Sequence, residues 1–174
     1  MIRGRAVVKK TFALLLLASL LEGCGGYQLG PATPGYLRNV HAIAIPTFTN
    51  TTLEPRLEVL VTNTAIKQFQ QDGTFRIVNA NAADATLKAE IIGVGRNPAR
   101  SVRGNVLSTT EFALSLTVKY KLVGRDGKDL TAGAVSGSTS FFVGSDVNTD
   151  QRQAMPLAAE ELARHLVSQL SEGW

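Results

Sequence analysis

One cysteine, Cys24, stands where its thiol could be modified covalently. A leucine-rich apolar run from Phe12 to Leu21 precedes it, and Gly23 lies directly before it. Four basic residues come ahead of the run: Arg3, Arg5, Lys9 and Lys10. Because the run is too short to span a bilayer, this layout predicts a lipoprotein signal peptide over residues 1–23. The Cys24 sulfur would then carry a thioether-linked diacylglycerol, and the freed Cys24 amine could be acylated as well.

Acyl chains on Cys24 would hold the chain at a membrane surface, since each buried methylene contributes about 0.8 kcal/mol. Glu22 departs from the pattern, because a small or neutral residue is usual there. An uncleaved anchor or an ordinary secretory signal is therefore the alternative interpretation. Gly25 rather than Asp follows the cysteine, which by resemblance to sorted lipoproteins favours the outer membrane of a two-membrane bacterium. Cys24 is the only cysteine, so no disulfide can form within the chain.

Three arginines in the segment 95–109 are the second candidate for chemistry, namely Arg96, Arg100 and Arg103. Guanidinium groups donate paired hydrogen bonds to phosphates. The wider segment from Ile91 to Lys128 holds seven basic residues against two acidic ones. Such a cluster attracts anions, and an exported protein does not meet nucleic acid, so anionic lipid or an acidic protein surface is the expected partner. The alternative is that these cations only blunt an exposed sheet edge.

The candidates for catalysis are weak. His41 and His165 are isolated, and neither has a companion at metal-ligand spacing. The sequence contains no serine nucleophile elbow, paired catalytic thiol or phosphate-binding loop. We therefore predict a protein that is not an enzyme and that needs no cofactor and no metal.

The first half of the domain follows a strand-helix-strand pattern after a tether. Residues 24–38 are rich in Gly and Pro, and residues 39–174 suffice for one domain. The stretch 40–48 is apolar on both faces, as in a buried strand. Pro55 suits the first turn of a helix that Asp72-Gly73 would end. Residues 75–78 would form a strand parallel to the first, reached by a right-handed crossover.

The second half predicts antiparallel strands. Residues 85–94 form one strand, and the arginine-bearing segment 95–109 is predicted to be a long loop. Residues 111–123 alternate strictly, with Phe112 to Leu122 apolar on one side and polar residues on the other. The turn 125–128 leads into a Gly, Ser and Thr-rich strand over 130–143.

A final helix is predicted from about Asp150 to Leu170, with Pro156 marking its first turn. The order of elements predicts a single α+β domain. Its sheet would be mixed and about four-stranded, with two helices packed on one face.

Several local patterns together resemble the lipopolysaccharide-assembly lipoprotein family LptE. They are Cys24-Gly25-Gly26-Tyr27, Ile43-Ala44-Ile45-Pro46 followed by Phe48 and Asn50, Ala83-Asp84-Ala85, the alternating strand from Phe112 to Leu122, and Phe141-Phe142. The resemblance covers nearly all of residues 24–174.

The resemblance implies a plug inside the lumen of the outer-membrane barrel LptD, lipid-anchored and facing the periplasm. Such a protein helps the barrel assemble and binds the lipid A phosphates of lipopolysaccharide during its insertion into the outer leaflet. Arg103 matches the family's arginine ahead of a Gly-Asn pair, so it is the first expected contact, followed by Arg100 and Arg96. Some relatives carry a further basic residue after the double-Phe strand end, whereas Gly144 to Asp146 offers none.

A different outer-membrane lipoprotein is the competing interpretation. Proteins resembling the CsgG or TolB N-terminal folds share the Ile-Ala-Ile-Pro strand, and they act in secretion or activate cell-wall synthesis. A secretion channel needs membrane-spanning strands of about 9–11 alternating residues. Only the hairpin that contains Phe112 comes close to that requirement.

Overall fold

The computed structural model describes residues 34–102 and 105–173, and side chains are described outside 101–110. The predicted signal peptide, Cys24, most of the tether and Arg103 lie outside the described residues. Within the described part, neither α-helix is long and apolar enough to cross a membrane.

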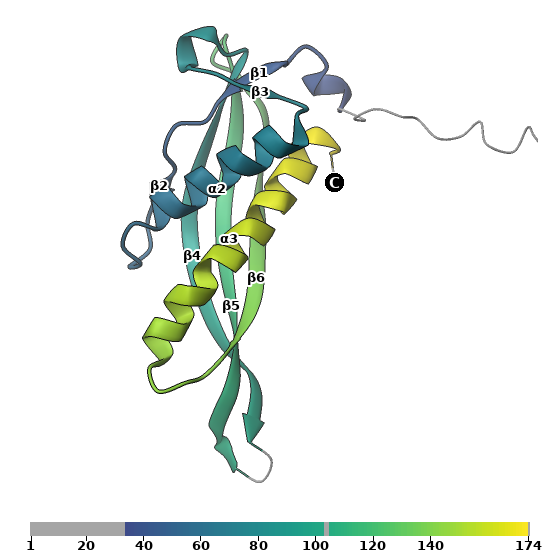
Figure 1. The fold of residues 1–174 in the computed structure, drawn as a ribbon. Helices are drawn as coiled ribbons and strands as arrows, with labels where there is room; N and C mark the ends of the chain where they lie inside the picture. The colour runs from purple at the N-terminus through teal and green to yellow at the C-terminus, as the bar shows by residue number, and fades with distance from the viewer. Residues whose placement is uncertain (1–33, 103–104, 174) are drawn as a thin grey trace, which may run out of the picture. The chain divides into compact units, whose positions relative to one another are not determined.

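Six strands form one mixed sheet, in the order β3-β1-β4-β5-β6 with β2 also beside β4 (Figure 1). The strands are β1 (Ala42–Ala44), β2 (Thr49–Asn50), β3 (Arg76–Ile77), β4 (Ala85–Val102), β5 (Asn105–Gly124) and β6 (Asp129–Phe142). β1 is parallel to both β3 and β4, which confirms the predicted parallel pairing across the crossover. β4, β5 and β6 are antiparallel neighbours.

The predicted α+β class is confirmed, with six strands rather than about four. One reason is that the strand predicted over 40–48 is shortened to β1, and the additional short strand β2 follows it; β1 and β2 pair with successive parts of β4. Pro46 lies in the break between them. Because proline has no N–H, it cannot donate a ladder hydrogen bond at that point.

Two helices, α2 (Leu57–Asp72) and α3 (Val147–Ser171), lie side by side on the same face of the sheet (Figure 1). Short 3-10 turns, η2 (Gly35–Leu37) and η3 (Ala80–Ala82), complete the elements. The core between the helices and the sheet is continuous, and it includes fully buried Phe69 of α2, Leu116 of β5 and Leu162 of α3. The predicted apolar face of β5 is therefore confirmed.

The predicted ends of the helices hold in part. α2 ends as expected at Gly73, whose positive φ of 77° lets its N–H reach the Phe69 carbonyl. The prediction that Pro156 starts the last helix is wrong, because Pro156 lies inside α3. The Asp146 side chain instead caps the helix by accepting from the Asn148 N–H at 3.0 Å.

The predicted loop over 95–109 is also wrong, because β4 and β5 continue pairing from Val94 opposite Leu116 to Val102 opposite Asn105. Register shifts interrupt the ladder near Gly93 and around Arg100. These bulges absorb the residues that would otherwise break a strand. The result is a long hairpin whose end projects beyond the helices (Figure 1).

Asp84 joins the start of β1 to the start of β4. Its Oδ2 accepts hydrogen bonds from the backbone N–H groups of His41 at 3.0 Å and Ala42 at 2.9 Å. The Arg125 guanidinium lies nearby and donates to the Ala83 carbonyl at 2.9 Å. The two N–H donors hold the pKa of Asp84 below its ordinary value. Desolvation opposes them, and the charge of Arg125 adds a smaller lowering effect.

Asp84→Ala should lower the free energy of unfolding by about 1–2 kcal/mol at pH 7, since two backbone donors lose their acceptor. The pKa of Asp84 is lower in the folded chain, so its contribution is complete above the unfolded-state value of about 3.9. The contribution is then lost as the pH falls through the folded-state pKa. Urea unfolding should show the variant and wild type converging in strongly acidic buffer. Asp129→Ala, which removes an exposed carboxylate, is the control.

Gly137→Ala tests how closely α3 approaches β6. A Cβ at Gly137 would overlap the backbone of Ala158 and Leu162, so the helix would have to move. We expect the free energy of unfolding to fall by about 3 kcal/mol. Gly93→Ala is the matched control, because its Cβ would meet only the Thr117 Cβ at 3.9 Å. Equal losses in the two variants, measured by urea unfolding, would contradict the direct packing of helix on strand.

Candidate functional site

Arg96 points toward the helix-covered face because of a bulge in β4. Before the bulge Leu87 and Ile91 face the core, and the register shifts between Ile91 and Gly93. After the shift Arg96 stands opposite the buried Leu114 of β5. One extra residue thus reverses which side chains meet the helices.

Arg96 is an exposed residue, but its guanidinium contacts partners within the protein. Its Nη1 donates to Gln151 Oε1 of α3 at 3.1 Å, and its Cζ lies 5.3 Å from the centre of the Phe112 ring. Gln151 Nε2 in turn donates to Glu54 Oε1 at 2.9 Å. Phe112 also stacks on Phe141 with ring centres 5.9 Å apart. Arg96 therefore ties the base of the long hairpin to α3 and to the loop before α2.

Arg100 is in a different environment, farther along the hairpin. Its side chain is 72% exposed, and its Nε lies 3.7 Å from Glu111 Oε2 on β5. Such an exposed and long ion pair contributes little to stability. The third predicted arginine, Arg103, lies outside the described residues. The structure therefore places Arg96 at the base of the hairpin and Arg100 on its exposed part.

The histidines lie apart. His41 is exposed just before β1, so the expectation that it lies in a buried strand is wrong. His165 Nδ1 is 2.6 Å from the Ser136 carbonyl oxygen, and the neighbouring Glu161 accepts from the Ser138 N–H at 2.8 Å. Both α3 side chains thus occupy backbone groups at the outer edge of β6. Among the described residues, no group of His, Cys, Asp and Glu could hold a metal.

No described helix covers the second face of the sheet, and this face is polar. Thr117 of β5 and Ser136 of β6 stand opposite each other there, with their hydroxyl oxygens 3.0 Å apart. The neighbouring pair is Ser115 and Ser138. We call this uncovered side of β4, β5 and β6 the open face. It is the polar side that the alternation in residues 111–123 predicts.

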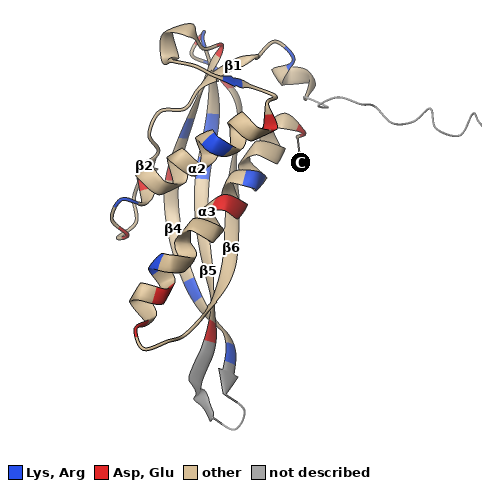
Figure 2. Ribbon diagram, in the orientation of Figure 1, with Lys and Arg blue, Asp and Glu red and all other residues tan. Residues whose placement is uncertain are grey.

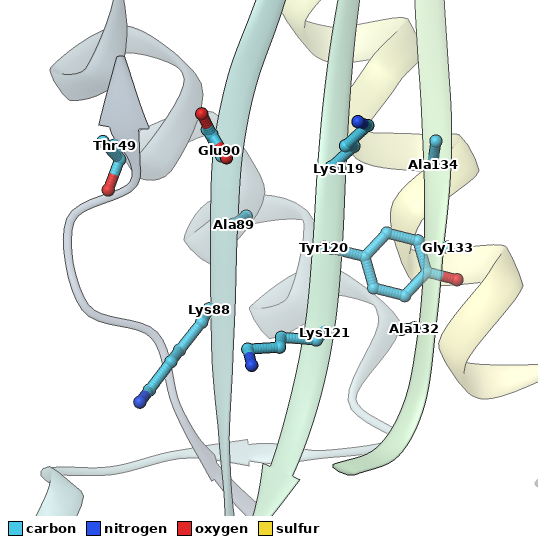
Figure 3. Close-up of a pocket in the computed structure, with 10 residues that line it drawn as sticks. All are labelled: Thr49, Lys88, Ala89, Glu90, Lys119, Tyr120, Lys121, Ala132, Gly133 and Ala134. Atoms are coloured by element: carbon cyan, nitrogen blue, oxygen red, sulfur yellow. The ribbon is translucent and has the colours of Figure 1, made fainter. Parts of the chain in front are cut away.

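A shallow pocket of about 490 Å³ lies on the open face (Figure 3). Two cross-strand pairs cross it, Lys88 opposite Lys121 and Glu90 opposite Lys119. Small residues of β6, including Ala132 and Ala134, form its far side. Figure 2 shows the basic residues on the adjacent strands β4 and β5.

Sequence reasoning missed Lys88 as part of this group. Lys119 and Lys121 belong to the basic segment 91–128, but Lys88 precedes that segment. The available signal was its place between apolar Leu87 and Ala89, which puts it on the polar side of its strand. Its pairing with Lys121 depends on the register of two strands, which residue types alone do not give.

The fold is that of a small α+β domain that recurs in bacterial proteins. Protein XCC0632 from Xanthomonas campestris is 11% identical over 82% of this chain and 88% of its own, with a TM-score of 0.57. PelC from Paraburkholderia phytofirmans, a dodecamer, is 16% identical over 83% and 96%, with a TM-score of 0.52. A minor lipoprotein from Acinetobacter baumannii is 14% identical over 75% and 93%, with a TM-score of 0.51. These similarities show that the chain has the same fold as these solved structures.

A family model narrows the class. The model of LptE, described as lipopolysaccharide-assembly, matches residues 40–170. The chain therefore belongs to the LptE family, as its resemblance predicted. No individual curated protein matches the chain at a significant level.

Arg96→Ala should destabilise the protein, because it removes both the contact with Phe112 and the hydrogen bond to Gln151. We expect a loss of about 1–2 kcal/mol in the free energy of unfolding. Arg100→Ala, which removes an exposed arginine from the same hairpin, should cost less than about 0.5 kcal/mol. Arg96→Lys should recover only part of the loss, since lysine lacks the planar guanidinium. Similar urea midpoints for both alanine variants would contradict a positioning role for Arg96.

Proposed function

We propose that the protein is an outer-membrane lipoprotein that binds lipopolysaccharide and plugs an LptD-like barrel. In this role it assists barrel assembly and enables lipopolysaccharide to enter the outer leaflet. Membership of the LptE family supports the proposal at the level of lipopolysaccharide assembly. The observation that carries it further is the open face, a broad polar sheet surface with no helix over it among the described residues.

A polar sheet surface suits the inside of a barrel. Barrel interiors are polar, because side chains alternate between lipid and lumen along each strand. Hydroxyl groups such as those of Ser115, Thr117 and Ser136 can exchange hydrogen bonds with such a wall. An apolar open face would instead favour burial in a membrane or a second core. The open face is therefore the surface that we assign to the barrel.

The anchor and the lipopolysaccharide contacts are the remaining parts of the proposal. Acylated Cys24 would hold the domain at the outer membrane, on the periplasmic side. Arg103, then Arg100, would donate to lipid A phosphates from the projecting hairpin. The exposed side chain of Arg100 supports this part. Arg96, which has partners inside the protein, would contribute mainly by holding the hairpin in place.

A second candidate is a secretion assembly built from copies of this chain. It is favoured by the likeness in fold to PelC, a dodecamer, and by the long β4–β5 hairpin. Its strands of 18 and 20 residues exceed the about 9–11 residues needed to span a bilayer. The two candidates differ in what the protein associates with in the outer membrane, namely a β-barrel protein or further copies of this chain.

Affinity purification of the tagged full-length protein from outer membranes tests both candidates. We expect a large β-barrel protein and lipopolysaccharide to copurify. Arg103→Glu should reduce the copurified lipopolysaccharide by about tenfold, since it replaces a phosphate donor by a repelling charge. It should leave the thermal midpoint and the bound barrel unchanged.

Lys67→Glu is the matched charge reversal, because Lys67 is exposed on α2 and outside the open face. It should leave the amount of lipopolysaccharide unchanged. A ring of identical chains without a barrel would favour the second candidate. Equal loss of lipopolysaccharide and of thermal stability in Arg103→Glu would point to a structural arginine.

A further inference from the structure

The lysine pair of the open-face pocket does not stabilise the sheet. Lys88 and Lys121 stand directly opposite each other on β4 and β5. Like charges in directly opposed positions repel and destabilise a sheet. Among the described residues Lys88 makes no ion pair, and Lys121 has only Asp129, with 3.6 Å between Nζ and Oδ2 and both side chains about half exposed. So weak a pair leaves the Lys121 ammonium group able to exchange partners.

The positive charge is concentrated at one end of the pocket. In the next cross-strand pair Glu90 stands opposite Lys119, so that pair is neutral overall. Figure 3 shows the side chain of Lys121 extending from β5 toward β4 and that of Lys88 extending beyond β4, whereas those of Glu90 and Lys119 point toward the other end of the pocket. An anion would therefore meet two ammonium groups at the Lys88 end, where Asp129, beside Lys121, is the acidic neighbour.

The far side of the pocket is small and apolar. Lys121 stands opposite Ala132 and Lys119 opposite Ala134, so β6 presents methyl groups where larger side chains would fill the hollow. The methylene stems of the lysines add apolar surface beside them. A volume of about 490 Å³ accommodates more than a free inorganic ion. The pocket thus combines a doubly cationic end with an apolar side.

We propose that this pocket binds a phosphate monoester carried by an apolar molecule, with the phosphate between Lys88 and Lys121. A phosphate monoester carries about −1.5 to −2 charges at pH 7, which matches two ammonium groups better than a single carboxylate does. Lysine binds phosphate as a compact point charge. Ala132 and Ala134 contact the apolar part. The site is separate from the hairpin arginines. It lies on the open face, which the function proposed above assigns to the barrel, so the proposal requires that the barrel wall leave this pocket uncovered.

Calorimetric titration of the full-length protein in nonionic detergent tests the site. The probes are dihexanoyl phosphatidic acid, inorganic phosphate and dihexanoyl phosphatidylcholine. We expect phosphatidic acid to bind, inorganic phosphate to bind at least about tenfold more weakly, and phosphatidylcholine not to bind. The double variant Lys88→Gln, Lys121→Gln should weaken the binding of phosphatidic acid by about tenfold or more, since two charge-assisted hydrogen bonds are lost.

Matched controls keep the test specific. Lys67→Gln, Lys128→Gln removes the same charge from exposed positions outside the pocket and should leave the affinity unchanged. The pocket double variant should be at least as stable as the wild type in urea, because a like-charge repulsion is removed. The hairpin contacts are tested by the lipopolysaccharide that copurifies with Arg103→Glu, and this site by the titration of the pocket double variant, so a failure of either one gives a different result.

Two outcomes would overturn the proposal. The first is equal affinity for inorganic phosphate and phosphatidic acid, which would remove the apolar carrier. The second is undiminished binding of phosphatidic acid by the pocket double variant. If that variant also no longer copurifies with a barrel, the lysines are instead a docking surface for an acidic protein.

Discussion

The contact between α3 and the backbone of β6 at Gly137 is the constraint on which the rest of the structure depends. No side chain separates helix from strand there, because a Cβ would overlap Ala158 and Leu162. This close approach sets the apolar stripe of α3 against the sheet, where Leu162 and Leu166 are fully buried. With α3 in place, α2 packs beside it on the same face (Figure 1). Both described α-helices therefore cover one face of the sheet, and the other face of the long strands is polar.

This one-sided cover explains where polar groups have internal partners. On the covered side Thr62 Oγ1 accepts from the Phe48 N–H at 2.9 Å, and Gln151 connects Arg96 to Glu54. No described buried side-chain nitrogen or oxygen lacks a hydrogen-bond partner. Burial requires such partners, because an unsatisfied buried polar group costs about 1–3 kcal/mol. On the open face water can supply the hydrogen-bond partners, so like charges such as Lys88 and Lys121 can stand opposite each other.

Much of the fold could be predicted from periodicity. Apolar spacing located α2, α3 and the buried face of β5, since regular spacing reports burial on one face. The bulge after Ile91 could not be predicted, because one inserted residue reverses the faces and no residue type signals it. Arg96 was therefore expected in a loop, whereas it faces the helices. Pro98 and the nearby glycines suggested a loop, yet pairing with β5 continues past them. The Lys88–Lys121 pair required the register, which is long-range information.

The bulge also divides β4 into two chemically different parts. Before it, β4 lies in the full sheet with β5 and β6 on one side and β1 and β2 on the other, so Lys88 stands on a well-supported surface. Beyond the pairing of Phe112 with Phe141, the hairpin leaves the cover of the helices (Figure 1), and residues 97–100 are all exposed. A two-stranded ribbon without a core is less constrained than a six-stranded sheet. In the proposed function, Arg100 would therefore meet a large and irregular glycolipid from a less constrained support. The proposed site at Lys88 and Lys121 would instead rest on strands that the full sheet supports.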